Sequence, residues 1–203
     1  MGNMGNILGD YLLIILAAIT IENVVFTRAM GLSRVISLVD NVRSTVIFCI
    51  LLSLTTALSS VIYYSIYHSY IDRIENATIF RVLILVLVMS VIYLLVFITA
   101  IKIIPYEHIG KAAEAMPTAT FNSMVFGVIM LSSIEQMTLS ETIVYSIGSS
   151  IGYTLAIIYV VEGQRKLQSR DIPAAFKGLP VTLLYLAGLA MAIYSLTGRI
   201  FTL

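Results

Sequence analysis

The apolar residues of the chain are grouped into runs that are long enough to cross a membrane. A bilayer-spanning helix needs about 20 mostly apolar residues, and six runs of this kind follow one another with only short polar stretches between them. The pattern predicts an all-α, polytopic membrane protein with six transmembrane helices in a single domain over residues 1–203. The predicted spans are residues 11–31, 44–67, 82–101, 115–134, 142–161 and 178–197.

Polar residues interrupt the first and fourth runs, whereas the second, third and fifth are continuous and rich in Leu, Ile and Val. In the first run, Glu22, Asn23 and Arg28 stand where apolar residues are expected, and Gly31 and Ser33 follow them. Irregular backbone at membrane depth is tolerated only where it is buried in protein or lines a cavity. We therefore expect a broken helix in each of these two runs. The residues that interrupt the fourth run are Pro117, Thr118, Thr120, Asn122, Ser123 and Gly127.

The two interrupted runs also resemble each other. Each contains an asparagine followed by a Val-Phe step and a glycine, within residues 23–31 and 122–127. They lie three spans apart, and an odd number of spans in each half gives the halves opposite orientations. The pattern predicts an inverted three-plus-three repeat, in which half-helices meet near the middle of the membrane. Gly31, Pro117 and Gly127 are the candidates for the irregular half-helix backbone.

Glu22, Asn23, Thr120 and Asn122 are candidates for a polar centre where the half-helices meet. A charged side chain at the bilayer centre costs about 2.5–3.5 kcal/mol on insertion scales, so Glu22 requires protein, water or a functional path around it. Two interpretations stay open for Glu22: an ion or proton site, or a structural carboxylate bonded to amides at the N-terminus of segment four. The asparagines favour interhelical hydrogen bonding. An ion pair of Glu22 with Arg28 requires a broken helix, since regular helical pairs are three or four residues apart.

The composition agrees with the hydrophobic pattern of a membrane protein and excludes several classes of function. Of the 203 residues, 59% are apolar and 11% are charged, against about 25% charged residues in a soluble domain. The net charge of +1 does not suggest nucleic-acid binding. The single cysteine, Cys49, excludes an internal disulfide and any CxxC motif. His68 lies in the tyrosine-rich stretch YYSIYHSY, which indicates an interfacial aromatic anchor and not a metal site.

The distribution of lysine and arginine predicts the orientation. The first, third and fifth loops carry nine of the 12 basic residues, and the opposite side carries three. Cytoplasmic loops are enriched in Lys and Arg, so we expect these three loops in the cytoplasm and both termini outside. The nine residues are Arg28, Arg34, Arg43, Lys102, Lys111, Arg165, Lys166, Arg170 and Lys177.

Three stretches resemble the Rnf/Nqr membrane-subunit family. IENVVFTRAMGLS, residues 21–33, is similar to the family's first half-helix, which typically ends Gly-Leu-Cys or Gly-Met-Cys. PTATFNSMVFGV, residues 117–128, is similar to the second, which reads like Pro-Leu-Ile-Thr-x-Asn-Cys. Residues 141–198 resemble the last two spans, including Asp171-Ile172-Pro173 and Lys177-Gly178. The Ile21-Glu22-Asn23 element and the outward termini look most like the branch that holds the A-type Rnf subunits together with the E-type Nqr subunits.

The resemblance implies a component of an ion-translocating electron-transport complex in the plasma membrane of a prokaryote. Family members pair with a second, oppositely oriented six-span subunit, beside further subunits and membrane lipid. Their facing half-helices hold an iron–sulfur cluster, of the [2Fe–2S] type, through two cysteines from each subunit. The whole complex couples electron transfer to Na⁺ or H⁺ translocation, and this subunit carries no active site of its own.

The sequence departs from the family at the two positions that hold the cluster. The family's cysteines fall on Ser33 and Ser123, and Cys49 matches neither position. Such clusters are normally held by thiolates, so the resemblance implies a subunit without the usual cluster. The alternative interpretation of both serines is that small hydroxyl residues allow close helix packing.

Two functions from different classes remain open from the sequence. The first is a non-catalytic membrane subunit of an Rnf/Nqr-type complex, which predicts stable association with the partner subunit. The second is an ion or small-solute transporter or channel derived from the same scaffold, because broken midplane helices suit transport. A protein that only seals the membrane part of a larger complex is a third possibility.

Overall fold

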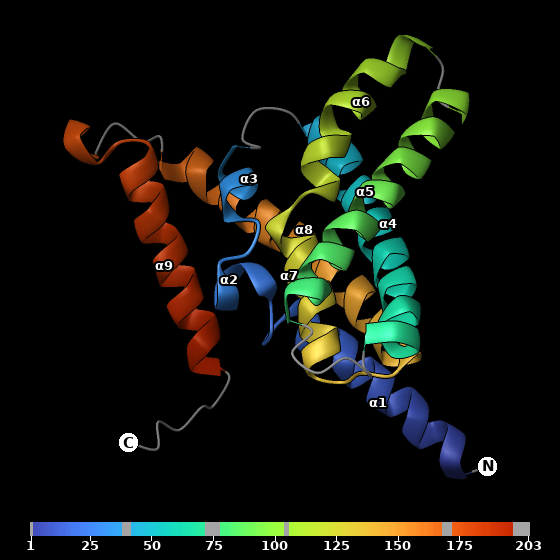
Figure 1. Ribbon diagram of the computed structural model, residues 1–203. Helices are drawn as coiled ribbons and strands as arrows, with labels where there is room; N and C mark the ends of the chain where they lie inside the picture. Colours follow the sequence, from blue (N-terminus) through green and yellow to red (C-terminus); the bar gives the residue numbers. More distant parts are fainter. Residues whose placement is uncertain (1, 38–41, 72–77, 104–105, 168–171, 197–203) are drawn as a thin grey trace.

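The computed structural model describes residues 2–37, 42–71, 78–103, 106–167 and 172–196, and within these ranges all regular structure is helical (Figure 1). The expected interruption of segments one and four is visible in the order of the elements, because each of these segments is divided between separate helices. The helices are α1 (Gly2–Ile19), α2 (Val24–Arg28), α3 (Leu32–Ser37), α4 (Val42–Ile66), α5 (Thr78–Ile103), α6 (Tyr106–Thr120), α7 (Ser123–Ile134), α8 (Leu139–Leu167) and α9 (Leu179–Leu196), with a π-helical turn η1 (Tyr67–Ile71) and a 3₁₀ turn η2 (Ala174–Phe176).

Long apolar helices confirm the prediction of a polytopic membrane protein. Among the described residues, four helical stretches are long and apolar enough to cross a bilayer. Shorter apolar helices at Ile7–Ile19 and Leu179–Ser195 correspond to the first and last predicted spans. The outer face of α5 exposes large apolar side chains, which suit a lipid environment. The four long stretches are Thr45–Tyr70, Ile79–Ile103, Ala113–Ile134 and Leu139–Leu167.

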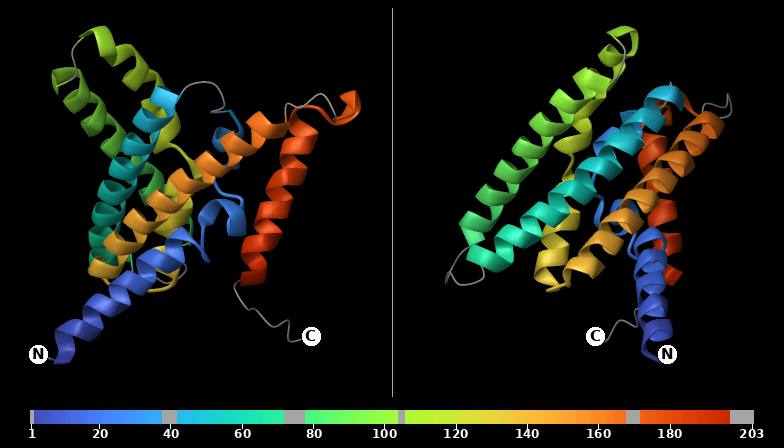
Figure 2. Two further views of the ribbon diagram at one scale, coloured as in Figure 1. Left: turned by 180° about the vertical axis from the view of Figure 1, so that it is seen from behind. Right: turned by 90° about the vertical axis from the view of Figure 1, so that its right-hand side faces the viewer.

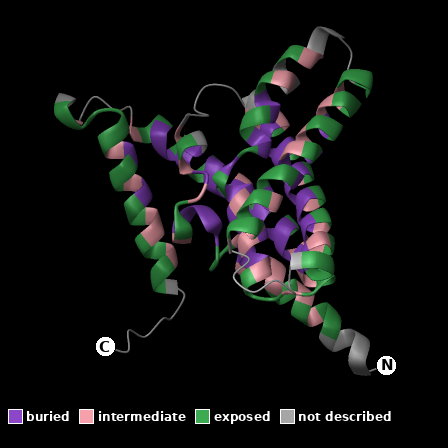
Figure 3. Cartoon of the chain, viewed as in Figure 1, coloured by how far each residue is buried: buried purple, intermediate pink, exposed green. Residues whose placement is uncertain are grey.

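Helix α8 crosses the middle of the molecule and contacts most other helices (Figure 2). The group α4, α5 and α6 lies on one side of α8, and α9 lies on the other. Buried residues concentrate where α2, α4, α7 and α8 meet, and the outward faces of α5 and α9 are exposed (Figure 3). The buried centre is therefore the place where broken and continuous helices come together.

Two glycines of α8 allow close packing of α1. A Cβ atom added at Gly148 would lie 3.0 Å from the Ala18 Cβ and 3.2 Å from the Ile15 backbone oxygen. At Gly152 it would lie 2.8 Å from the Ala18 carbonyl oxygen. The two glycines are four residues apart, so they lie on one face of α8, an arrangement that brings membrane helices into backbone contact.

Both expected helix breaks are confirmed, and each is followed by a capped helix. In segment one, α1 ends at Ile19 and Asn23 is the N-cap of α2. In segment four, α6 ends at Thr120 and Asn122 is the N-cap of α7. Pro117 lies inside α6, and its carbonyl still accepts a hydrogen bond from the Phe121 amide at 2.9 Å. The break therefore begins one turn after the proline rather than at it.

The two candidate backbone glycines have different roles. Gly31 has a φ of +73°, a left-handed conformation that favours glycine, and it lies in the irregular chain between α2 and α3. Gly127 lies within the regular helix α7, where an added Cβ would overlap the Met30 side chain. Gly127 therefore allows close approach of the first break to α7, and the backbone remains helical there.

Candidate functional site

Asn23 joins the first helix break to α8. Its Oδ1 accepts a hydrogen bond from the Val25 amide at 3.1 Å, which caps α2. Its Nδ2 donates to the Ile19 carbonyl at 3.0 Å and to the Gly152 carbonyl at 2.8 Å. The side chain is only 2% exposed. One buried amide thus satisfies backbone groups on both sides of the gap, which irregular backbone in a membrane requires.

Asn122 has the same local role at the second break. Its Oδ1 accepts a hydrogen bond from the Met124 amide at 2.9 Å and caps α7. Its Nδ2 donates to the Tyr153 hydroxyl at 3.3 Å. The two asparagines therefore bind adjacent residues of α8, and the described contacts include no hydrogen bond between them. Their interhelical hydrogen bonds run to a third helix and not directly from one break to the other.

A hydrogen-bonded chain through Gly31 connects the irregular chain between α2 and α3, which follows the first break, to the second break. The Tyr153 hydroxyl donates to the Gly31 carbonyl at 2.9 Å, and the Gly31 amide donates to Ser123 Oγ at 2.7 Å. A Cβ on Gly31 would lie 2.8 Å from Asn122 Oδ1 and 2.9 Å from the Tyr153 hydroxyl. We call Gly31, Asn122, Ser123 and Tyr153 the break network. It holds the two irregular segments together within one chain.

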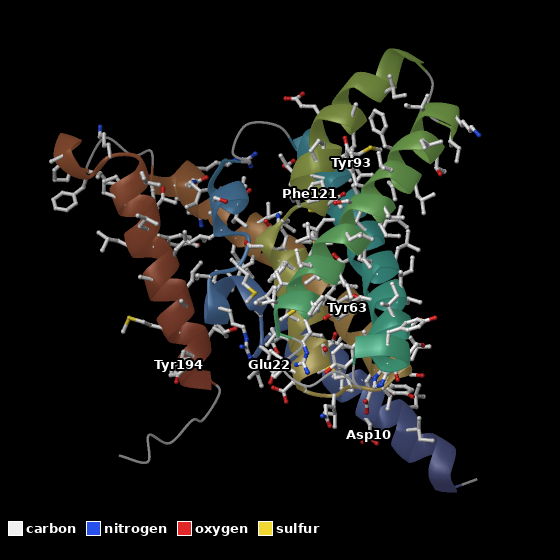
Figure 4. All side chains as sticks on the ribbon, viewed as in Figure 1. Asp10, Glu22, Tyr63, Tyr93, Phe121 and Tyr194 are labelled. Atoms are coloured by element: carbon white, nitrogen blue, oxygen red, sulfur yellow. The ribbon has the colours of Figure 1, made fainter. Side chains whose placement is uncertain are left out.

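The other residues predicted for the polar centre are not part of the break network. Glu22 is exposed, and the described residues show no ion pair between it and Arg28, which is also exposed. No described hydrogen bond links the Glu22 carboxylate to the first amides of α7. Figure 4 shows Glu22 well separated from Phe121, the residue that precedes Asn122. Thr120 is buried at the end of α6, with 1% exposure.

The similarity of this chain to known proteins extends over nearly its whole length. A family model described as "Rnf-Nqr subunit, membrane protein" matches residues 11–200. The chain belongs to the Rnf-Nqr family. This confirms the resemblance carried by residues 21–33 and 117–128 and by the last two spans.

Relatives of this Rnf-Nqr protein include A-type subunits of ion-translocating oxidoreductase complexes. The chain is 25% identical over 193 residues to the A-type subunit of the ion-translocating oxidoreductase complex of Pasteurella multocida, covering 94% of this chain and 98% of that one. It is 25% identical over 187 residues to the A-type subunit of the Na(+)-translocating ferredoxin:NAD(+) oxidoreductase complex of Acetobacterium woodii, covering 91% and 95%. The A-type subunit of the ion-translocating oxidoreductase complex of Vibrio cholerae is 23% identical over 193 residues, covering 94% and 98%.

The donor atoms of this Rnf-Nqr protein do not fit an iron–sulfur cluster at the two positions that the resemblance assigns to the cluster cysteines. Ser33 carries an exposed hydroxyl on α3, and Ser123 Oγ already accepts a hydrogen bond from the Gly31 amide. Cluster iron is normally held by thiolates, and the single thiol, Cys49, lies in α4 beside a groove of about 630 Å³ between α4 and α8. Among the described residues, no group of three or more His, Cys, Asp or Glu side chains is placed to hold a metal ion.

Sequence reasoning missed Tyr153 and Gly152, which anchor both breaks of this Rnf-Nqr protein. Tyr153 is 0% exposed although it carries a hydroxyl, and its ring centroid lies 6.3 Å from that of Phe48. A signal was present in the fifth run, because Gly148 and Gly152 form a small-xxx-small pattern that favours close helix packing. That pattern identifies α8 as a packing helix, but it does not say which side chains it receives.

Proposed function

We propose that this protein is the A-type membrane subunit of an Rnf-type ion-translocating electron-transport complex. The observation that carries the proposal is the match over nearly the whole chain to relatives that are named as the A-type component of such complexes. The paired, asparagine-capped breaks support the proposal, because half-helices that meet inside the membrane suit ion-coupled proteins. The protein lies in the plasma membrane of a prokaryote, with its first, third and fifth loops in the cytoplasm.

The proposal includes a second six-span subunit of opposite orientation, beside the other subunits of the complex. Irregular backbone at membrane depth needs protein around it, yet several residues at the breaks are exposed in the isolated chain. Phe121 is 50% exposed and Ile21 is 43% exposed, and the hydroxyl-bearing residues Ser33 and Ser123 are exposed as well. A partner subunit that covers this surface removes the break from contact with lipid.

Cross-linking tests the position of the partner. In a Cys49→Ser background, a cysteine placed at Ser123 becomes the single thiol of the chain and faces the proposed interface. We expect a bifunctional thiol reagent to join this variant to a second membrane subunit in native membranes. The matched control is a cysteine at Ser90, whose Oγ donates to the Val86 carbonyl of its own helix at 2.8 Å. A stable protein that purifies alone, with no adduct at Ser123, would contradict the proposal.

The protein works without the usual iron–sulfur cluster in this proposal. The test is the iron content and visible spectrum of the complex purified anaerobically from its native membrane. We expect that neither Ser33 nor Ser123 holds iron. The iron content of the Ser33→Ala/Ser123→Ala variant should therefore equal that of the wild type. Iron that bleaches on reduction and disappears in that variant, but not in Ser90→Ala, would overturn this part of the proposal.

Transport of an ion or small solute by the same scaffold is the second candidate function. Hydroxyls in place of thiolates favour it, because oxygen donors suit hard cations and polar solutes better than they suit cluster iron. This function predicts uptake into proteoliposomes by the purified chain alone, and loss of uptake in Glu22→Gln. Uptake that does not change in Glu22→Gln would exclude Glu22 from the transport path.

A further inference from the structure

Buried hydroxyl groups lie on α4 and α8 around the place where the two helices meet. Ser60 and Ser146 meet across this contact, and Tyr63 lies beside Ser133 of α7. The members on α8 are three or four residues apart and share one face, and on α4 Tyr63 is three residues from Ser60 and four from the adjacent Ser59. We call this set the hydroxyl seam, and each member is at most 2% exposed: Ser59, Ser60 and Tyr63 of α4, and Thr142, Ser146 and Ser149 of α8.

Most of the hydroxyl seam lacks hydrogen-bond partners within the described part of the chain. One bond crosses it directly, between Ser146 Oγ and Ser60 Oγ at 2.7 Å. The remaining four hydroxyls, those of Ser59, Tyr63, Thr142 and Ser149, have no partner among the described residues. Buried polar atoms are normally bonded to protein or to ordered water, and other serines of this chain bond to their own helix, as Ser53 does to the Cys49 carbonyl at 2.9 Å. Buried hydroxyls without a protein partner in successive turns therefore indicate groups that bond to a small polar ligand.

The spaces beside these hydroxyls suit water. Ser149 lies close to Tyr145, and Tyr63 lies close to Ser133, but in neither pair do the hydroxyls meet with hydrogen-bonding geometry. A water molecule bridges polar groups that are too far apart for a direct bond. A cavity of about 10 Å³ lies between α4 and α7, lined by Ser60, Tyr63 and Ser132, with Gln136 and Met137 from the loop that leads to α8. This size corresponds to about one water molecule.

We propose that the hydroxyl seam binds a file of water molecules, which leads from the loop between α7 and α8 to the break network. A hydroxyl both donates and accepts, so each member bonds to water on either side. A dehydrated Na⁺ or divalent cation is a less suitable occupant, because hard cations in proteins favour sites rich in carboxylate and carbonyl oxygens. The hydroxyl seam contains no carboxylate.

The file ends at Tyr153, which bonds to the second break and to the irregular chain between α2 and α3. Ser146, Ser149 and Tyr153 follow one another at helical spacing, and Ser149 is one turn from Tyr153. With a rise of 1.5 Å per residue, Ser146 and Tyr153 are about 10 Å apart along α8. The Tyr153 hydroxyl bonds to Asn122 and to Gly31. If the proposed function holds, this file is the route by which a proton reaches the breaks from one side, but the binding of water does not depend on that function.

Radiolytic labelling of the full-length protein tests the proposal, since X-ray pulses turn bound water into hydroxyl radicals that modify adjacent side chains. The probes are Tyr63 and Tyr145, which are 2% and 3% exposed. Tyr70, which is 71% exposed, is the reference in contact with solvent, and Met89 of α5, which is 3% exposed and outside the hydroxyl seam, is the reference without water. After correction for intrinsic reactivity, we expect both probe tyrosines to be modified nearly as fast as Tyr70.

Variants connect the labelling to the hydroxyl seam. The Ser59→Ala/Ser149→Ala variant should lose most of the modification at Tyr145, whereas Ser149→Thr, which keeps the hydroxyl, and Ser90→Ala should retain it. Modification of the wild-type tyrosines no faster than that of Met89 would show that no water is bound in the hydroxyl seam and would overturn the proposal. Modification that falls when NaCl replaces choline chloride would overturn it in favour of a cation. Neither result depends on a partner subunit or on ion transport, so a failure here is distinct from a failure of the proposed function.

Discussion

Replacing Tyr153 by phenylalanine removes one hydroxyl from the break network and leaves the ring packing in place. The hydroxyl donates to the Gly31 carbonyl at 2.9 Å and accepts from Asn122 Nδ2 at 3.3 Å. The Gly31 carbonyl keeps a longer bond from the Val35 amide at 3.3 Å, whereas Asn122 loses the acceptor for its Nδ2. The variant therefore leaves one buried donor unpaired and removes the shorter of the two hydrogen bonds to the Gly31 carbonyl.

The expected cost of Tyr153→Phe is about 1–2 kcal/mol in the free energy of unfolding. An unpaired buried donor costs about 1–3 kcal/mol in water-soluble proteins. Side-chain hydrogen bonds between membrane helices average about 0.6 kcal/mol, with a maximum of about 1.7 kcal/mol. Tyr153 lies in the buried centre and bonds to two different segments, so we expect a value toward the upper end of the membrane range.

Equilibrium unfolding in mixed micelles, titrated with SDS, measures this difference. The matched control is Tyr159→Phe on the same helix, because Tyr159 is 54% exposed and its bond to Tyr185 uses the Tyr159 backbone carbonyl. The control should change the unfolding free energy by less than about 0.5 kcal/mol. If Tyr153→Phe were as stable as Tyr159→Phe, the hydroxyl would not hold the second break against the chain between α2 and α3, and the break network would not contribute to stability.

Three further changes test other parts of the structure. Gly152→Leu should destabilise the protein by about 1–3 kcal/mol, because a side chain there meets the α1 backbone. Gly188→Leu should not destabilise it, because no described atom lies within 4 Å of an added Cβ; equal SDS midpoints for the two variants would contradict close α1–α8 packing. Asn23→Ala should lower the free energy of unfolding by about 1–2 kcal/mol through loss of the α2 cap. It should also increase proteolysis between α1 and α2 in detergent. Cleavage unchanged from wild type would argue that Asn23 does not hold α1 and α2 together. Ser123→Ala leaves the buried Gly31 amide without its acceptor and should lower the free energy of unfolding by about 1–2 kcal/mol. Ser33→Ala, at an exposed position, should leave the free energy of unfolding unchanged. An unchanged stability of Ser123→Ala would show that Ser123 is not part of the break network.

The hydrophobic pattern was sufficient for the architecture because length and polarity are local properties of the chain. Each predicted span corresponds to helical segments in the structure, and the interruptions at Asn23 and Asn122 lie where the polar residues predicted them. The shared Asn-Val-Phe pattern also has a local physical counterpart, since both asparagines cap the helix that follows. The inverted repeat inferred from that pattern stays a prediction.

Helix packing decides which groups the polar residues bond to, and the sequence alone does not show these groups. Glu22 and Asn23 are neighbours in the chain, yet Glu22 is exposed and Asn23 is buried, because the end of α1 turns one side chain outward and the other against α8. Pro117 suggested the place of the break, but a proline disturbs the turn before it, through its missing amide and the clash of its ring with the carbonyl four residues earlier, and α6 continues for three more residues.

From the sequence alone came the class of protein, the apolar helical segments, the two breaks and the family, because hydrophobicity, chain-breaking residues and short motifs are all encoded over a few consecutive residues. Only the tertiary structure brought Gly31, Ser123 and Tyr153 into one hydrogen-bonded network. It also placed the Ser60 hydroxyl of α4 against the Ser146 hydroxyl of α8. These contacts join residues 86 to 122 positions apart, and such pairings depend on how helices pack against one another and not on the pattern within any one of them.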